Sequence, residues 1–600
     1  MKQGTRALRL AAGGVLVVGS SGAAALVAAT PAGASTFSVS NTNDSGAGSL
    51  RQAVLDANAN AGADTITFDP SVTGTITLTS GQIAISDSVT ITGPGAATLT
   101  VSGNDASRIF DVTGTTDLAI SDLTMAHGKI IGAGSNYEQG GALRLKQTGA
   151  TTISGVVFQD NEVDGLGGAI GGATYKGGCF TGDLTITDSE FTGNLARGGG
   201  AVGFYCWGSG TVTITGSSFT GNQAGHGDTT FRNGGAVRIS GDKNIVVSDS
   251  TFENNAVLPD PANPTSLDAE AGAGYFGGWS RTTTITGVTV NNNSAQRAPG
   301  FIIFTSNAAT VANSTFTDNH ELSTNPQVGA GALSLQAPGG NGAGTYKVLQ
   351  TTISGNTSNG GAVSGLGIHH RQGRPQPTVD LYGSIVAGNI GGSDLGTGGG
   401  DFAGNLSDNL FTLNVARSVV GSVRAATPVT DKGGNQQGVT DPKLAPLANN
   451  GGRTKTMALL AGSPALDAGG PTAPTFPGNQ FDQRGSGFAR VVNGLVDVGA
   501  FEAQPPTLSS VSPPEGPLVG GTTITLNGTN FAAGMTVTVG GAACTDVVVV
   551  SSTEATCTVP PGSAGAVDVA IDVLGLAASL PEAFTYVADP NGEVVPTFTG

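Results

Sequence analysis

The sequence predicts an all-β protein in which a long right-handed parallel β-helix is followed by a small β-sandwich. Three observations predict this fold: a short motif that recurs about every 33 residues, strand-like alternation of apolar and polar residues between its copies, and a composition with 97 Gly but only 12% charged residues. A unit of this length cannot bury its own apolar face, so copies must stack on one another at the strand spacing. The expected architecture is therefore a solenoid.

The recurring motif is F-x-x-N, with Ile or Val in place of Phe in some copies. A second apolar residue stands five positions before each anchor, from Ile153 before Phe158 to Leu381 before Val386. An amide can both donate and accept hydrogen bonds between neighbouring coils, so we expect the asparagines to form an internal ladder rather than to bind ligand or glycan. The eight asparagines are Asn161, Asn194, Asn222, Asn255, Asn293, Asn319, Asn356 and Asn389.

The open end of such a stack needs a cover. Ser49 to Gln52 reads as a capping box, and Leu50, Ala53, Val54 and Ala57 would form one apolar helical face, so a short helix is expected to close the N-terminal mouth. The first coils are expected in five strand-like segments, at residues 65–68, 75–78, 89–91, 98–101 and 109–112.

Residues 1–34 have the features of a secretory signal peptide. Lys2, Arg6 and Arg9 precede an uncharged stretch and the small residues Ala32 to Ala34. No later segment is long and apolar enough to span a bilayer, so an exported chain without a membrane span in its mature part is expected. The β-helix with its cap is assigned to residues 35–440.

The charge balance restricts the partners. There are 26 Lys and Arg against 43 Asp and Glu, and removal of the signal peptide makes the net charge of −17 more negative. Nucleic acid is therefore not expected as a partner, whereas an extracellular glycan or surface macromolecule is. A monomer is expected. No cofactor is expected, and no motif supports a structural Ca²⁺ site.

The repeats resemble those of a known family. The alternation of G-G-A-[ILV], as in residues 140–143, with F-x-x-N is similar to the repeats of the chlamydial-type polymorphic outer membrane proteins over residues 125–389. This resemblance implies a surface-exposed β-helix with an adhesive role.

A second resemblance lies downstream. Residues 441–447, 462–469, 482–485 and 496–502 are similar to the choice-of-anchor Q domain, whose members are exported β-helices. The resemblance implies that residues 441–503 form the C-terminal end of the β-helix, and it implies no catalytic residue.

The pattern of the sequence changes after Gln504. The run from Gly520 to Phe531 and the alternating apolar residues that follow it resemble an immunoglobulin-like IPT/TIG domain, assigned here to residues 504–588. In extracellular members of that family a cysteine pair stands at the positions of Cys544 and Cys557. Residues 589–600 are expected to form a flexible tail.

The four cysteines form two local pairs, and in an exported chain two disulfides are expected. Cys179 and Cys206 stand twelve and thirteen residues before Phe191 and Phe219, so they should be neighbours on successive coils.

Two enzyme classes act through β-helices of this kind. His226 and Arg238 are similar to elements of polygalacturonases, but no neighbouring aspartate pair supports a hydrolase. A pectate-lyase mechanism needs clustered carboxylates and a basic residue, and the acidic residues do not share one column of the repeat. These residues are Asp183, Asp242, Asp268 and Glu270. His369 and His370 lack a third metal ligand and are expected in a solvated turn.

Aromatic residues provide the best candidate for binding. Trp207 and Trp279, the only tryptophans, stand at similar positions two coils apart and could stack on sugar rings, or could instead pack the bases of enlarged loops. The predicted glycan site also contains Tyr175, Tyr205, Tyr275 and Arg281. The sequence thus favours a non-enzymatic, adhesin-like surface protein, with a polysaccharide lyase or hydrolase and a structural envelope spacer as alternatives.

Overall fold

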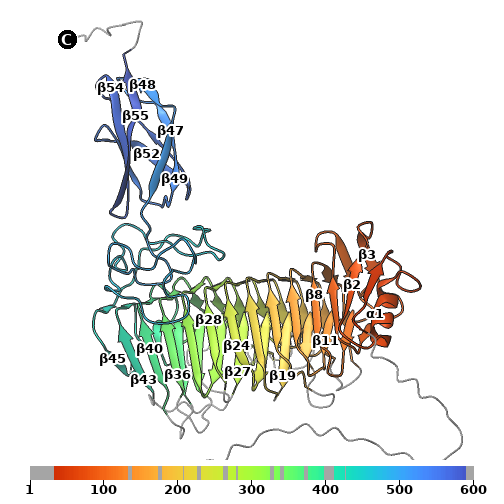
Figure 1. Ribbon diagram of the computed structural model, residues 1–600. Helices are drawn as coiled ribbons and strands as arrows, with labels where there is room; N and C mark the ends of the chain where they lie inside the picture. The colour runs from red at the N-terminus through yellow and green to blue at the C-terminus, as the bar shows by residue number, and fades with distance from the viewer. Residues whose placement is uncertain are drawn as a thin grey trace, which may run out of the picture.

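The computed structural model describes residues 33–132, 138–172, 179–206, 208–225, 232–260, 268–278, 281–324, 330–337, 344–370, 376–397, 411–425 and 427–588. Within these ranges the chain forms a long parallel β-helix, and a β-sandwich projects to one side of it near its C-terminal end (Figure 1). None of the helices in these ranges has the length and hydropathy to cross a membrane. The predicted signal peptide up to residue 32 and the predicted tail lie outside them.

Four parallel sheets form the sides of the β-helix. We name them sheet A with 14 strands, sheet B with 13, sheet C with 11 and sheet D with 8. Their first and last strands are β1 (Thr36–Val39) and β45 (Val429–Asp431) in A, β3 (Gly74–Thr77) and β46 (Gln436–Gln437) in B, β4 (Ile83–Ile85) and β42 (Ser393–Thr397) in C, and β10 (Lys129–Ile130) and β38 (Thr357–Ser358) in D.

One coil passes through the sheets in the order A, B, D, C. A representative coil contains β12 (Thr151–Ser154), β13 (Val157–Gln159), β14 (Glu162–Val163) and β15 (Ile170–Gly172). Each strand pairs with its counterpart in the next coil, as the repeat length requires.

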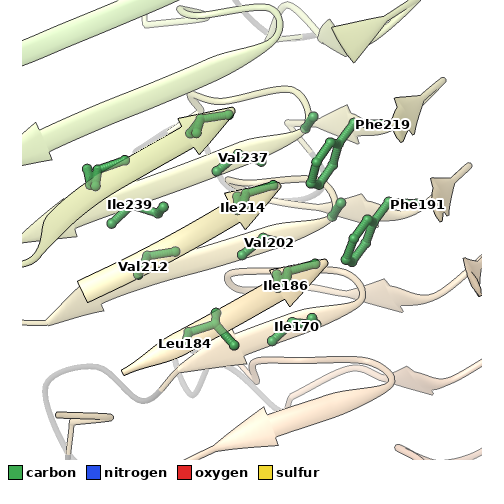
Figure 2. Close-up of a cluster of buried hydrophobic side chains, with 14 of the residues drawn as sticks. Ile170, Leu184, Ile186, Phe191, Val202, Val212, Ile214, Phe219, Val237 and Ile239 are labelled. Carbon is green, nitrogen blue, oxygen red and sulfur yellow. The ribbon is translucent and has the colours of Figure 1, made fainter. Parts of the chain in front are cut away.

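The predicted apolar anchors form a continuous column in this register. In sheet B, Phe158 pairs with Phe191 and Phe191 with Phe219, and the column continues to Val386. The rings of Phe191 stack on those of Phe158 and Phe219 with centroids 4.7 and 4.6 Å apart. Figure 2 shows two of these rings beside the rungs of Ile, Leu and Val from the other sheets. The predicted fold is confirmed by this register.

The asparagines of the F-x-x-N motifs lie in a buried ladder at the turn between sheets B and D. The Asn161 backbone N and Nδ2 both donate to Oδ1 of Asn194, at 3.1 and 3.0 Å, and Nδ2 of Asn194 also donates to the Phe158 carbonyl. The same contacts link all eight asparagines in order from Asn161 to Asn389. Buried amides thereby satisfy the backbone groups of the turn.

The residue before each ladder asparagine explains the spacing inside the motif. This residue turns the chain with a positive φ, for example 51° at Asp160, 59° at Asn254 and 66° at Gly193. Gly, Asn and Asp tolerate this left-handed conformation best, and every copy of the motif has one of the three at this position.

The expected helix, α1 (Leu50–Ala59), covers the N-terminal end of the stack (Figure 1). Its buried residues are the four predicted, and Ser49 Oγ accepts from the Gln52 backbone N at 3.2 Å. The predicted capping box is only half formed, because the Gln52 side chain donates forward to Asp56 at 2.8 Å. Each of the five expected first strand segments overlaps a strand to within one residue: β2 (Asp64–Phe68), β3, β5 (Val89–Thr92), β6 (Leu99–Ser102) and β7 (Phe110–Val112).

Residues 441–503, which we call the extension, do not add coils to the end of the β-helix, as the sequence had led us to expect. They pack against the outward side of sheet B near its C-terminal end (Figure 1). Gln483 reaches β29 (Thr289–Asn291), where its Nε2 donates to Thr289 Oγ1 at 3.0 Å, and Ala500 N donates to Thr352 Oγ1 at 3.0 Å. Because the extension buries the outward-facing hydroxyls of Thr289 and Thr352, these contacts supply the hydrogen-bond partners that replace water.

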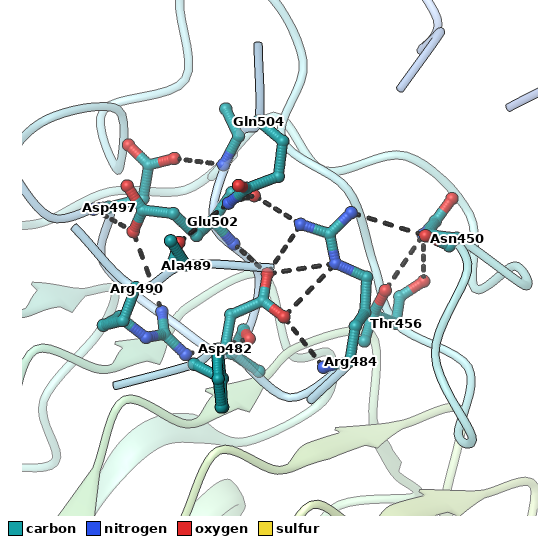
Figure 3. Close-up of polar contacts among 12 residues, drawn as sticks. Asn450, Thr456, Asp482, Arg484, Ala489, Arg490, Asp497, Glu502 and Gln504 are labelled. Atoms are coloured by element: carbon teal, nitrogen blue, oxygen red, sulfur yellow. Dashed lines mark hydrogen bonds and ion pairs between the residues drawn. The ribbon is translucent and has the colours of Figure 1, made fainter. Parts of the chain in front are cut away.

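A buried polar network stabilises the extension (Figure 3). Arg484 binds the Asp482 carboxylate, with Nη2 2.6 Å from Oδ2, and lies between the rings of Phe488 and Phe501. Arg490 is fully buried and donates to Asn313 of the β-helix at 2.7 Å. Asp482 and Arg484 come from residues 482–485, one of the segments similar to the choice-of-anchor Q domain, so this part of the sequence pattern has a structural role.

The β-sandwich contains two sheets. One consists of β47 (Thr507–Ser512), β49 (Thr523–Thr529), β53 (Glu554–Thr558) and β52 (Thr545–Ser551), and the other of β48 (Glu515–Pro517), β55 (Leu576–Val587), β54 (Gly565–Val573), β50 (Thr536–Val539) and β51 (Ala542–Ala543). Cys544 and Cys557 form the predicted disulfide.

Candidate ligand-binding groove

A groove with a volume of about 740 Å³ lies on the outward face of sheet A, near its C-terminal end. Its floor is made by β36 (Thr345–Leu349), β40 (Thr378–Tyr382) and β43 (Thr412–Ala416). Side chains alternate between the two faces of a strand, so the register places the outward residues in two rows. One row is Lys347, Asp380 and Asn414, and the other is Leu349, Tyr382 and Ala416.

The extension forms one wall of the groove through Pro474 and Thr475. The next residue, Phe476, is buried in a small apolar cluster with Leu349 and Ala312, and Tyr382 packs against this cluster. Phe476 therefore attaches the wall to the floor.

The turns after β43 and β45 close the far end of the groove, the first with Arg417 and the second with Lys432, Gly433 and Gly434. Arg417 has a positive φ of 48°, and its backbone N donates to the Gly433 carbonyl at 3.0 Å. Its guanidinium lies against Gly470 of the extension, at a place where any Cβ would collide with it. A residue with a Cβ at position 470 would therefore displace the guanidinium of Arg417 from its present position.

The polar groups of the groove suit binding better than acid–base hydrolysis. Asp380 supplies the one carboxylate among the lining residues, and its Oδ1 accepts from Asn414 Nδ2 at 2.8 Å. Glycoside hydrolysis commonly uses two carboxyl groups on opposite sides of the bond. A concave site with one aromatic side chain and several fixed polar groups is typical of ligand recognition.

Two regions of the chain match known families. Residues 141–422 match the right handed beta helix region, and residues 506–586 match the IPT/TIG domain. The chain carries a right-handed β-helix region and a C-terminal IPT/TIG domain. The disulfide described above lies within this IPT/TIG domain.

Other likenesses are short. A 93-residue stretch is 37% identical to fibrocystin-L of Mus musculus and covers 15% of this chain but only 2% of that protein. The plexin A4 extracellular region is 24% identical over 14% of this chain and 9% of its own, with a TM-score of 0.14. SGBP-B from a complex xyloglucan utilization locus in Bacteroides uniformis is 28% identical over 15% of this chain and 25% of its own, with a TM-score of 0.13. These likenesses assign no ligand to the β-helix.

The aromatic site predicted from the sequence is not brought together on an open surface by the residues that the structure describes. Trp207, Trp279 and Tyr175 lie outside the described residues. Tyr275 faces outward from sheet C but is buried against Phe304, and burial raises the pKa of its phenol to about 12. Tyr275 is therefore a packing residue, which is the role that the alternative interpretation gave to Trp207 and Trp279.

The two remaining members of that site lie in different surroundings. Tyr205 is partly buried beneath the guanidinium of Arg238, whose Cζ lies 5.5 Å from the ring centroid. Arg281 is partly buried, and its carbonyl accepts from Thr305 Oγ1 at 2.8 Å.

Cys179 and Cys206 are neighbours, as the repeat predicted, but the structure does not join them in a disulfide. Their side chains share a hydrogen bond, and burial together with this contact raises the pKa of the Cys206 thiol well above its usual range. Lys243 lies nearby, with its Nζ 4.8 Å from the centroid of the Phe180 ring and donating to the Gly182 carbonyl at 2.9 Å. The expected covalent link is corrected to a contact between thiols.

The expectation for the histidine pair was wrong. His369 and His370 lie in β39 (Val363–His370), and His369 is buried rather than solvated. The strand of sheet C continues through both residues because it pairs with Gln336 and Ala337 in the preceding coil. His226 lies outside the described residues.

Two of the acidic residues considered for lyase chemistry lie in different surroundings. Asp183 is exposed beside the start of sheet A, where its Oδ1 accepts from Thr211 N, whereas Glu270 is buried in an ion pair with Arg297. Among the described residues, no group of three or more His, Cys, Asp or Glu side chains is placed to hold a metal ion.

Sequence reasoning missed the groove, although part of its signal was present. Lys347 and Asp380 each precede a predicted core residue, Val348 and Leu381, so the repeat already placed them on the outward face in adjacent coils. The wall could not be predicted, because no local pattern shows that Phe476 packs on sheet A.

Proposed function

We propose that this chain is a non-enzymatic extracellular or surface protein that binds a glycan in the groove on sheet A. The pairing of a β-helix with an IPT/TIG domain fits an extracellular or surface protein. The observation that carries the proposal is the groove itself, in which Tyr382 lies between charged and amide side chains under a wall from the extension. Protein sites bind sugars through an aromatic ring that stacks on the sugar and through groups that form hydrogen bonds with its hydroxyls.

Export and surface attachment belong to the same proposal. The pattern of residues 1–34 supports a cleaved signal peptide. The motifs of residues 441–503 support a choice-of-anchor Q assignment, and the repeats support a likeness to polymorphic outer membrane proteins. N-terminal sequencing of the mature protein tests the cleavage, which is expected after Ala34.

A glycan array probed with the mature chain tests the binding function. Tyr382→Leu keeps the apolar contact with Phe476 but removes the ring, so it should lower the affinity for the best glycan. Tyr205→Leu is the matched control, because Tyr205 belongs to the earlier aromatic candidate outside the groove. Loss of binding in the control but not in Tyr382→Leu would place the site elsewhere.

Turnover assays separate binding from the alternatives. The purified chain should release neither reducing ends nor unsaturated uronate products from the polysaccharides that it binds. Sustained turnover would overturn the non-enzymatic proposal in favour of a lyase or hydrolase. A blank glycan array would favour a structural spacer.

A further inference from the structure

We propose that the groove on sheet A binds an anionic glycan, a sugar chain with carboxylate or sulfate groups. The proposal rests on the glycan-binding function proposed above. Among the lining residues, Lys347, Arg417 and Lys432 are cationic, and Asp380 is the one acidic residue. The whole chain has 26 basic and 43 acidic residues, so the excess of basic residues in this groove is opposite to the charge of the chain.

The three cations are available to a ligand. Several basic residues elsewhere in the β-helix are held in ion pairs, as between Arg51 and Asp44 at 2.7 Å and between Lys129 and Glu162 at 2.7 Å, and Lys243 donates to backbone carbonyls. In the described part of the chain, none of the three groove cations has a carboxylate within 4.0 Å. A concave surface with one sign of charge concentrates ligands of the opposite sign.

The carboxylates near the groove are engaged by local hydrogen bonds. Asp380 accepts from Asn414 on the neighbouring strand. Asp431, which precedes Lys432 but does not line the groove, accepts from Gly433 N at 2.7 Å and from Asn435 Nδ2 at 2.6 Å. All three hydrogen bonds direct the carboxylate oxygens toward donors of the protein.

The spacing of the cations suits a polymer. Lys347 lies on β36, and Lys432 follows β45, three strand steps further along sheet A. Three steps correspond to roughly 14 Å. A single small anion cannot contact both ends, whereas a chain with repeated charges can do so. Arg417 at the far end provides the planar fork that matches carboxylate or sulfate oxygens, and Tyr382 lies between the two ends.

Binding by the whole mature chain should be measured with four polymers: polygalacturonate, dextran sulfate, neutral dextran and polyglutamate. We expect at least one of the two anionic glycans to bind more tightly than dextran and polyglutamate, and to bind more weakly as salt is raised. The better of the two identifies the carboxylate or the sulfate as the preferred group.

Variants locate the site. The triple variant Lys347→Gln, Arg417→Gln and Lys432→Gln should weaken binding by about tenfold or more, and Asp380→Asn should strengthen it by about threefold. Lys443→Gln is the matched control, because Lys443 is an exposed lysine outside the groove. An unchanged melting temperature of the triple variant shows that it is folded.

The possible outcomes separate the two proposals. Binding of dextran as tight as that of the anionic glycans, unaffected by the triple variant, would overturn the anionic inference and leave glycan binding intact. Equal binding of polyglutamate would show recognition of charge without sugar and would also overturn the inference. No binding to any glycan would remove both proposals.

Discussion

Asp394 accepts two hydrogen bonds from Asn389 at a single carboxylate oxygen, from the backbone N and from Nδ2, each at 2.8 Å. Asn389 is the last asparagine of the ladder, so a buried carboxylate takes the place that the next amide would occupy. The other oxygen of Asp394 accepts from Ser422 N at 2.8 Å and from its hydroxyl at 2.9 Å. Asp394 thus terminates the ladder and attaches the following coil.

Asp394→Ala should destabilise the last coils, because it leaves the donors of the half-buried Asn389 without their acceptor and removes the hydrogen bonds from Ser422. The expected loss is about 2 kcal/mol. Hydrogen exchange at the amides of Asn389 and Ser422 would report it, and Asp394→Asn, which keeps an acceptor for Asn389, should lose less. Unchanged exchange at both amides in Asp394→Ala would show that the ladder needs no terminal acceptor.

Phe191→Ala should lower the stability of the β-helix by about 3–5 kcal/mol, because it leaves a cavity between two stacked rings in a fully buried column. Thermal unfolding measures the effect. The neighbouring Thr192 points outward and is exposed, so Thr192→Ala is the matched control and should change stability by less than about 0.5 kcal/mol. Equal effects of the two substitutions would contradict the stacked core.

The extension should loosen as the pH rises. Burial raises the pKa of Asp497 to about 6 and that of Glu502 to about 9. A carboxyl with a higher pKa in the folded protein stabilises the fold below its unfolded pKa, and this stabilisation is lost as the pH rises through the folded pKa. Stability of the extension should therefore fall between about pH 4 and pH 9.

Limited proteolysis of residues 441–503 across this pH range measures the change. Glu502→Gln keeps an acceptor for Asp497 N but cannot ionise, so it should flatten the profile above about pH 6. Glu190→Gln, on the exposed side of β17 (Glu190–Thr192), is the control and should leave the profile unchanged. A stability that rises with pH would refute the assignment of raised pKa values.

Removing the disulfide should destabilise the IPT/TIG domain but not the β-helix. Cys544 and Cys557 are separated by 13 positions, and closing a loop of this size contributes about 3 kcal/mol. The double variant Cys544→Ala and Cys557→Ala should show an earlier unfolding transition of that domain alone. A single transition shifted as a whole would mean that the domain and the β-helix unfold together.

Most of the β-helix was predictable because its information is local. Each coil repeats the same short pattern, so the spacing from Ile153 to Phe158 and on to Asn161 places core, turn and ladder without knowledge of distant contacts. The capping helix was predictable for the same reason, since its apolar face and N-cap lie within ten residues.

The groove depended on contacts that no local pattern encodes. Its wall follows from Phe476 packing on Leu349, and the absence of a Cβ at Gly470 leaves space for the guanidinium of Arg417 in its present position. The interpretation of Tyr275 failed because alternation shows which residues face outward from a strand but not what covers that face. The thiol contact of Cys179 and Cys206 was likewise placed by the repeat, whereas the bonding state was not.

By itself, the sequence determined the rungs, the turns and the ladder, because hydrophobic periodicity and left-handed turn residues act within one coil. Only the tertiary structure decided where the extension lies, which outward face stays open and which cations remain without ion pairs. Those features arise when segments more than fifty residues apart meet, and such contacts depend on complementary surfaces that form only after the coils have stacked.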